Sequence, residues 1–219
     1  LTNLSWSPDE KYIFLAEVNR DQNHMWFNIY DATNGKKIKT LFEERNNKWV
    51  EPEHAAVFLP NSNSEFLWLS ERDGFMNLYK YDINSSNVSP LSNFSWVIKA
   101  IVGFDEGGKN VIILGTGNDG RETRAYKINL KNGKFELLTK EPGSHSIQIS
   151  SDGKYILDSY SSMEVPRVVK IKSIKTGKEE TIYTSKNPIE KYQLGTTEFL
   201  TLKSEDGANL YGRIIKPAN

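Results

Sequence analysis

One stretch of the sequence decides the fold: Ile147-Gln148-Ile149-Ser150-Ser151-Asp152-Gly153-Lys154-Tyr155-Ile156-Leu157. Two short apolar runs flank a polar turn in this stretch. The pair Asp152-Gly153 favours a tight turn, because glycine adopts a positive φ without a clash from a Cβ atom. The β-branched and apolar residues on both sides are typical of paired strands. The stretch therefore predicts a β-hairpin.

The same strand–turn–strand pattern occurs three more times, at residues 4–14, 58–69 and 102–114. The four copies follow one another at intervals of roughly 45 to 52 residues. A period of that length, with this content, is typical of the blades of a β-propeller.

A second feature repeats in phase with the hairpins, namely a third strand followed by a turn. Its four copies occupy residues 25–31, 76–82, 124–129 and 167–172. A weaker fourth strand, at residues 37–42 in the first repeat, closes each blade. No window keeps the period near 3.6 that indicates a helix. We therefore predict an all-β fold in which residues 1–190 form a partial β-propeller of about four blades, each of four antiparallel strands.

The rhythm of the repeats stops after Asn187-Pro188. Residues 198–203 and 209–215 then predict two strands around the turn Glu205-Asp206-Gly207, with no repeat partner upstream. We predict that residues 191–219 are a linker and the first β-hairpin of another, truncated domain. The sequence starts inside a strand pattern, so we expect the chain to be a piece of a longer protein.

Composition excludes several classes of protein. Lys plus Arg and Asp plus Glu both number 28, which argues against a nucleic-acid partner and a polybasic membrane patch. The chain has no Cys, so it can form neither a disulfide nor a thiolate metal site. No apolar run approaches the length of a membrane span, so we expect none in this chain.

The motifs of common catalytic and cofactor sites lack their context here. Residues 115–120 match G-x-G-x-x-G, but a strand rather than a helix is predicted to follow, so we expect a loop between the second and third strands of a blade. His24, His54 and His145 show no metal-ligand spacing and are expected to be structural. The G-x-S-x-G pattern of a serine nucleophile is absent. We expect no catalytic residue, no metal site and no cofactor in this chain.

Trp49-Val50-Glu51-Pro52-Glu53-His54 is the most conspicuous junction between a loop and a strand. An aromatic ring beside carboxylates can line a pocket that holds a cationic amine. Alternatively, Trp49 packs between two blades and both glutamates face water. We name Trp49, Val50 and Glu51 as candidate substrate-binding residues.

An ordered series of segments resembles the second half of the N-terminal β-propeller of the dipeptidyl peptidase IV family, within the prolyl oligopeptidase class of serine peptidases. It includes Lys48-Trp49-Val50-Glu51 and Asn77-Leu78-Tyr79-Lys80-Tyr81-Asp82, together with residues 18–24, 66–74, 151–155 and 158–162. The resemblance covers essentially the whole chain. The abundance of Asn, Lys and Ile suggests a bacterial member.

The resemblance implies an eight-bladed propeller paired with an α/β-hydrolase domain of the same polypeptide. Such enzymes release N-terminal dipeptides with Pro or Ala second from peptides with a free N-terminus. Their Ser, Asp and His would lie beyond Asn219, and the hairpin of residues 198–217 resembles the first strands of the hydrolase domain. The propeller would gate access to the active site and contribute to the substrate pocket. A periplasmic, secreted or cell-surface location and a homodimer are further expectations.

Two features of the family limit what can be transferred. Its paired glutamates stand in a Trp-Val-Tyr-Glu-Glu context that is missing here, so Glu43-Glu44 does not take over their role. A substrate-contacting loop of the family lies near Trp49-Val50, but the match ends after Val50. The alternative function is a non-catalytic propeller that binds other proteins.

The repeats also predict which residues form the core and how the ends behave. Equivalent places in the first two strands of each blade should be largely buried, namely Trp6, Phe14, Phe58, Leu67, Trp68, Ile112, Ile149 and Ile156. The terminal blades carry apolar residues and no polar cap. We expect their free faces to be exposed and to favour self-association or contact with further blades. The terminal blades carry Trp6, Phe14 and Trp26 at one end, and Ile149, Ile156, Val168 and Val169 at the other, and neither set resembles a cap.

Overall fold

A computed structural model describes residues 1–218 of the chain, which contain strands and turns but no α-helix. Sixteen of the eighteen strands form four sheets of four antiparallel strands each. Blade 1 consists of β1 (Thr2–Trp6), β2 (Tyr12–Val18), β3 (His24–Asp31) and β4 (Lys37–Arg45). Blade 2 consists of β5 (Val57–Phe58), β6 (Glu65–Ser70), β7 (Asn77–Asp82) and β8 (Asn87–Pro90). Blade 3 consists of β9 (Ile98–Phe104), β10 (Asn110–Gly115), β11 (Arg124–Asn129) and β12 (Phe135–Leu137). Blade 4 consists of β13 (Ser144–Ile149), β14 (Tyr155–Ser161), β15 (Val168–Ser173) and β16 (Glu179–Thr184).

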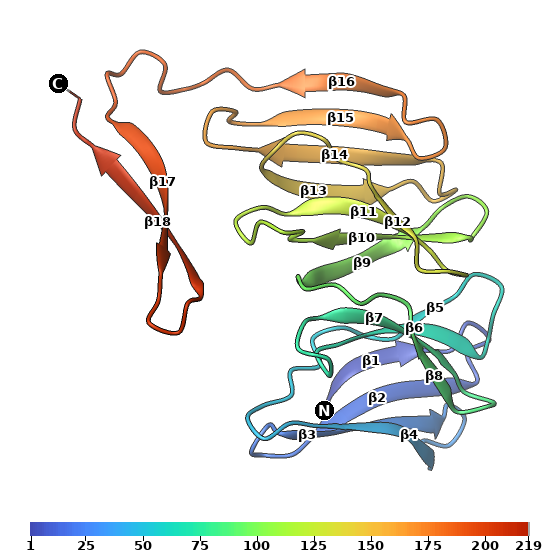
Figure 1. Ribbon diagram of the computed structural model, residues 1–219. Coiled ribbons are helices and arrows are strands. Elements are labelled where there is room, and N and C mark those ends of the chain that lie inside the picture. The colour runs from blue at the N-terminus through green and yellow to red at the C-terminus, as the bar shows by residue number, and fades with distance from the viewer. Residues whose placement is uncertain (219) are drawn as a thin grey trace.

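Within each sheet the strands lie in the order in which they occur along the chain, as in a propeller blade. The four sheets also follow one another in chain order, from blade 1 at the bottom of Figure 1 to blade 4 at the top. The predicted all-β fold and the predicted four-stranded blades are therefore confirmed.

The hydrophobic core lies between the sheets, as one apolar cluster at each of the three junctions between neighbouring blades. Strand β6 of blade 2 shows how the sequence produces this arrangement. Phe66 and Trp68 pack in the cluster shared with blade 1, whereas Leu67 and Leu69 pack in the cluster shared with blade 3. Because successive side chains of a strand point to opposite faces, a strand between two sheets must be apolar at every position.

The Asp152-Gly153 turn of blade 4 meets the equivalent turn of blade 3. Gly153 has a φ of +69°, and a Cβ atom there would lie 2.6 Å from the carbonyl carbon of Asp105 and from the backbone nitrogen of Glu106. The Glu106 amide donates a hydrogen bond of 3.0 Å to the carbonyl oxygen of Gly153. The glycine predicted from its turn conformation is therefore also required by close packing between blades.

The prediction of core residues is wrong for Trp6, which is 52% exposed. In the β1–β2 pairing, Ser5 lies opposite the buried Phe14, whereas Trp6 lies opposite Ile13. Directly paired residues share a face, so Trp6 points away from blade 2. Phe58 and Ile149 are half-buried, and the other five predicted residues have exposures of 1% or less: Phe14, Leu67, Trp68, Ile112 and Ile156.

Apolar side chains are exposed on both terminal blades, as predicted. Leu4 and Trp6 are exposed on blade 1, whereas Ile182 and Tyr183 are exposed on blade 4. Three apolar residues of the terminal blades are buried rather than exposed, with exposures of 0%, 0% and 7%: Phe14, Ile156 and Val168.

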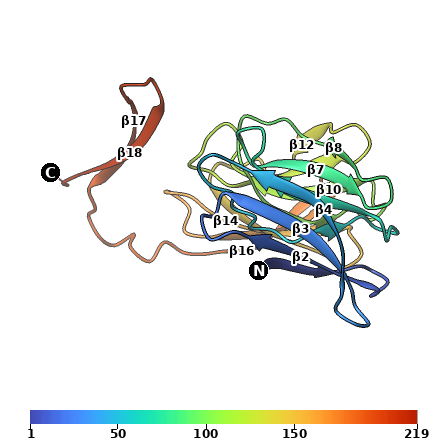
Figure 2. The same ribbon diagram turned by 90° about the horizontal axis from the view of Figure 1, so that it is seen from below.

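Strands β17 (Thr196–Lys203) and β18 (Asn209–Lys216) form a separate two-stranded sheet. Figures 1 and 2 show this hairpin standing apart from the blades, at the end of an extended segment that follows β16. Residue 219, the last of the predicted 191–219 segment, lies outside the described residues. That this hairpin opens a hydrolase domain stays a prediction. Among the described residues, no helix has the length and apolar character needed to span a membrane.

Candidate functional site

The candidate residues Trp49, Val50 and Glu51 all line one cavity of about 190 Å³ between blades 1 and 2. Three pieces of the chain surround it. The end of β4 provides Glu43 to Asn46, the connection from β4 to β5 provides the candidate residues, and the end of β6 with the following turn provides residues 69–72. The strand order brings these pieces together, because β4 and the β6–β7 turn lie at the same edge of adjacent sheets.

An ion pair between Arg72 and Glu44 fixes one wall of the cavity. Arg72 Nη2 donates to Glu44 Oε1 over 2.6 Å, and Nε donates to Ser70 Oγ over 3.0 Å. The indole Nε1–H of Trp68, a core residue, donates to the same Glu44 oxygen over 3.0 Å. Two donors therefore hold this carboxylate, and the core directly positions the wall of the cavity.

The other side of Arg72 rests on two tyrosines of β7. Its Nη2 lies 2.5 Å from the Tyr81 hydroxyl oxygen, and its guanidinium lies 4.6 Å from the ring centroid of Tyr79. Burial raises the pKa of the Tyr81 hydroxyl to about 12, against the opposing charge of Arg72. Tyr81 is therefore protonated and neutral at physiological pH, and Arg72 remains paired with Glu44.

Glu43, the neighbour of Glu44 in sequence, is held by a separate set of partners. Its Oε2 lies 2.7 Å from His24 Nε2 and 3.2 Å from Arg45 Nη2. The hydrogen bond from His24, followed by that from Arg45, lowers the pKa of the Glu43 carboxyl below its ordinary value. The charge of Glu43 is therefore balanced locally.

Glu51 and Glu71 leave the cavity with an excess of negative charge. Within residues 1–218, neither carboxylate has an ion pair. Burial, with the added repulsion of Glu51, Glu53 and Glu44, raises the pKa of the Glu71 carboxyl. A raised carboxyl pKa means that the site disfavours a further negative charge. A cationic group placed here would relieve the repulsion.

Trp49 is 54% exposed at this cavity, so it does not pack between two blades, whereas Glu51 and Glu53 are exposed, as the alternative interpretation expected. The neighbouring Val50 is anchored, because its amide donates a hydrogen bond of 2.7 Å to the carbonyl of Gln22. An exposed indole beside two unpaired carboxylates can bind a cation through its π face and by charge.

Eight further residues line the cavity and were not among the predicted ones, including the charged residues Glu44, Glu71 and Arg72. The Glu43-Glu44 pair lacks the sequence context of the family's paired glutamates, and Glu71 and Arg72 stand in the connection between β6 and β7, where no motif marks them. Their places in the repeat could have indicated them, because equivalent ends of strands in two adjacent blades lie next to each other.

The structure also shows where His145 and the G-x-G-x-x-G match lie. His145 is 3% exposed, with Nδ1 2.8 Å from Asp158 Oδ1 and Nε2 2.9 Å from the carbonyl oxygen of Glu141. Residues 116–123 form a loop between β10 and β11, as predicted for the G-x-G-x-x-G match. No group of three or more His, Asp or Glu side chains in residues 1–218 is arranged to hold a metal ion.

The stacked four-stranded sheets define the class of the protein, a β-propeller domain with a polar cavity between two blades. The chain belongs to the dipeptidyl peptidase IV family, because the sequence model of the dipeptidyl peptidase IV (DPP IV) N-terminal region matches residues 1–167. The resemblance stated from the sequence is therefore confirmed.

Solved structures agree with this assignment. A protein of Bacteroides ovatus, assigned as a dipeptidyl aminopeptidase IV, is 34% identical and superposes on 100% of the chain with a TM-score of 0.92. Dipeptidyl peptidase 4 of Porphyromonas gingivalis is 23% identical over 98% of the chain, with a TM-score of 0.85, and supports the fold. The chain spans 34% and 31% of those two proteins, or about a third of their length.

Proposed function

We propose that this chain is the propeller portion of a serine exopeptidase that releases N-terminal dipeptides, and that its cavity contributes to the peptide-binding space. The observation that carries the proposal is the family match over residues 1–167. The 34% identity to the Bacteroides ovatus protein over the whole chain supports it. The catalytic Ser, Asp and His would come from an α/β-hydrolase domain that follows in the same polypeptide.

The position of the cavity supports a role in substrate binding. It includes Arg72 of the β6–β7 turn, whose equivalent in blade 3 is the β10–β11 loop with Arg121. Arg121 contacts Phe199 and Tyr211 of the hairpin, at centroid distances of 5.1 and 5.0 Å. The cavity therefore opens at the same edge of the sheets as the hairpin, and a domain that continued from β18 would start on that side.

The charge of the cavity suggests what it binds. Four carboxylates and two arginines line it, and the unpaired ones are Glu51 and Glu71. With Trp49 beside them, they fit the cationic amine of a peptide and disfavour its carboxylate. A propeller placed over the hydrolase site would also restrict entry to narrow, flexible substrates.

Kinetics of the longer protein with a chromogenic Gly-Pro amide test this proposal. We expect Glu51→Gln and Glu71→Gln each to raise KM with kcat nearly unchanged, because the lost attraction acts on the bound substrate throughout the reaction. Glu190→Gln, an exposed glutamate between β16 and β17, is the matched control and should leave both constants unchanged. KM values like that of the control for both cavity variants would refute the role of the cavity. Absence of any turnover by the longer protein would refute the peptidase function itself.

A further inference from the structure

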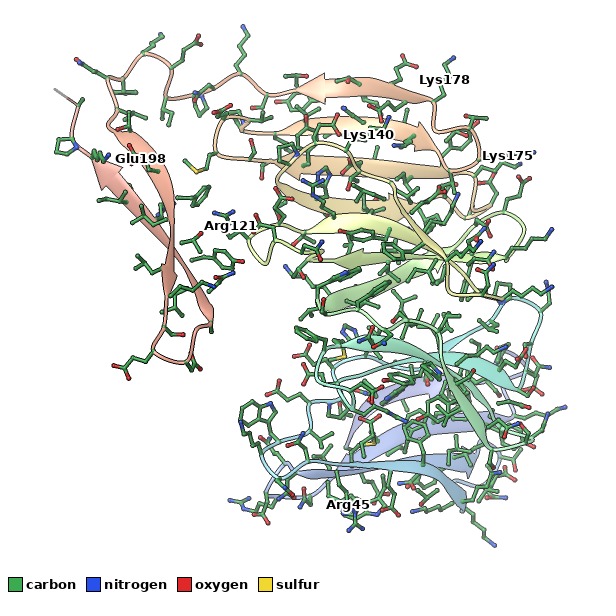
Figure 3. The ribbon with its side chains drawn as sticks, viewed as in Figure 1. Arg45, Arg121, Lys140, Lys175, Lys178 and Glu198 are labelled. Carbon is green, nitrogen blue, oxygen red and sulfur yellow. The ribbon has the colours of Figure 1, made fainter. Side chains whose placement is uncertain are left out.

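Arg121 of the propeller contacts the hairpin of β17 and β18. Arg121, in the β10–β11 loop, has its guanidinium carbon 5.1 Å from the ring centroid of Phe199 and 5.0 Å from that of Tyr211. Figure 3 shows Arg121 reaching from the edge of blade 3 toward the hairpin. Both distances are within the range of a cation–π interaction.

The pairing of the two hairpin strands places the rings of Phe199 and Tyr211 next to each other. Phe199 pairs with Arg213, and Tyr211 pairs with Thr201, so the aromatic residues are diagonal neighbours across the two strands. Diagonal residues of this kind lie on the same face of a sheet. The hairpin therefore presents both rings together to a single cation.

Arg121 is held in place before it meets the rings. Asp119 accepts from its Nε over 2.9 Å and from its Nη2 over 2.7 Å, which is a bidentate pair. The same carboxylate accepts from the Arg121 backbone amide over 3.0 Å. The bonds from Arg121 also lower the pKa of the Asp119 carboxyl, so the pair stays ionised well below neutral pH. A fixed planar guanidinium loses little freedom on stacking.

Most residues of the hairpin and of the segment before it are exposed. The connecting residues 185–195 are almost entirely exposed, and the apolar residues Leu202, Leu210 and Ile215 of the hairpin are 58%, 52% and 62% exposed. A Cβ atom on Gly120, next to Arg121, would lie 4.0 Å from the Tyr211 ring, so this loop also makes close contact. A cleft of about 760 Å³ beside the contact separates the hairpin from the loops of blades 3 and 4.

We propose that the loop of residues 116–123 is the docking site of the β17–β18 hairpin, and that Arg121 is the latch that sets where the hairpin lies relative to the propeller. The hairpin supplies the two aromatic rings, and Asp119 orients the arginine. When the contact of Arg121 with the two rings is broken, the hairpin stays attached to the propeller through residues 185–195, and the cleft between them widens. The proposal does not depend on a peptidase activity.

Distance measurements between two spin labels on the full chain test the latch. The chain has no Cys, so Glu205→Cys in the hairpin turn and Lys140→Cys on the propeller, both exposed, give unique attachment sites. We expect one narrow distance distribution in this doubly labelled background. Arg121→Gln should broaden it several-fold, because the cation is lost. Arg121→Lys, which keeps the charge but lacks the planar fork, should give an intermediate width.

The control variant is Lys216→Gln, which removes an ion pair of 2.7 Å to Glu198 within the hairpin but leaves Arg121 and both rings intact. It should keep the narrow distribution. Circular dichroism of each variant shows whether the blades remain folded. A narrow distribution in folded Arg121→Gln, or a broad one already in the labelled parent, would overturn the proposal.

Discussion

Trp68 connects the core of the propeller to its cavity, and replacing it gives a quantitative test of both. The side chain is 1% exposed, and its ring lies 4.5 Å from that of Phe27 and 5.4 Å from that of Phe42. An aromatic side chain buries about 200 Å², which is worth about 5 kcal/mol at about 25 cal/mol per Å². Truncations of this type cost about 3–5 kcal/mol. We therefore expect Trp68→Ala to lower the free energy of unfolding by about 4 kcal/mol.

Trp68→Phe separates the hydrogen bond from the packing. It keeps a ring between the two phenylalanines but removes the donor to Glu44, so we expect a loss of about 1–2 kcal/mol. Urea denaturation followed by circular dichroism measures both variants, with the slope of the transition as a check on two-state behaviour.

Trp6→Ala is the matched control, because it removes the same side chain from a 52% exposed position. We expect it to cost less than about 1 kcal/mol. A loss below about 1 kcal/mol for Trp68→Ala would refute the arrangement of the junction between blades 1 and 2.

Four further predictions follow from the blades and the cavity. Gly153→Ala should cost more than about 2 kcal/mol and Gly177→Ala only about 1 kcal/mol, since both have positive φ but only the first meets a neighbouring turn; equal losses in thermal unfolding would contradict this. His145→Ala should cost about 3–5 kcal/mol by leaving the buried Asp158 without its partner, and Asp158→Asn in that background should restore part of the loss. Because Glu71 binds its proton more tightly when folded, its contribution to stability should increase on acidification and be lost as pH rises through its raised pKa; Glu71→Gln should remove this slope from unfolding curves recorded between acidic and neutral pH. The exposed apolar faces of blades 1 and 4 should cause self-association, and a strictly monomeric species in sedimentation at micromolar concentrations would contradict it.

The repeat of hairpins with third strands predicts the blades because both signals are local. A turn pair such as Asp152-Gly153 and the alternation of strand residues act within a few positions of each other. Local signals do not show which face of each strand packs against another blade. Trp6 and Phe14 look equally apolar in the sequence, but the β1–β2 register places them on opposite faces, and only one face is covered.

The cavity was predictable only in part, for a related reason. Trp49, Val50 and Glu51 are conspicuous because an aromatic and a carboxylate adjoin in one segment. Glu44 and Arg72 are 28 positions apart and meet only because adjacent blades align their edges. No local pattern encodes that meeting, so the ion pair emerges from packing rather than from a motif.

The central claim is that the cavity between blades 1 and 2 binds the cationic amine of a peptide. The most direct test is a nuclear magnetic resonance titration that follows the indole Nε1–H signal of Trp49, one of five tryptophans in the chain. The ligand is a tripeptide with Pro second and its C-terminus amidated, in two forms that differ only in a free or an acetylated N-terminus. We predict a saturable shift of the Trp49 signal with the free amine, and none with the acetylated peptide. Equal shifts with both forms, or no shift at Trp49 with either, would contradict the claim.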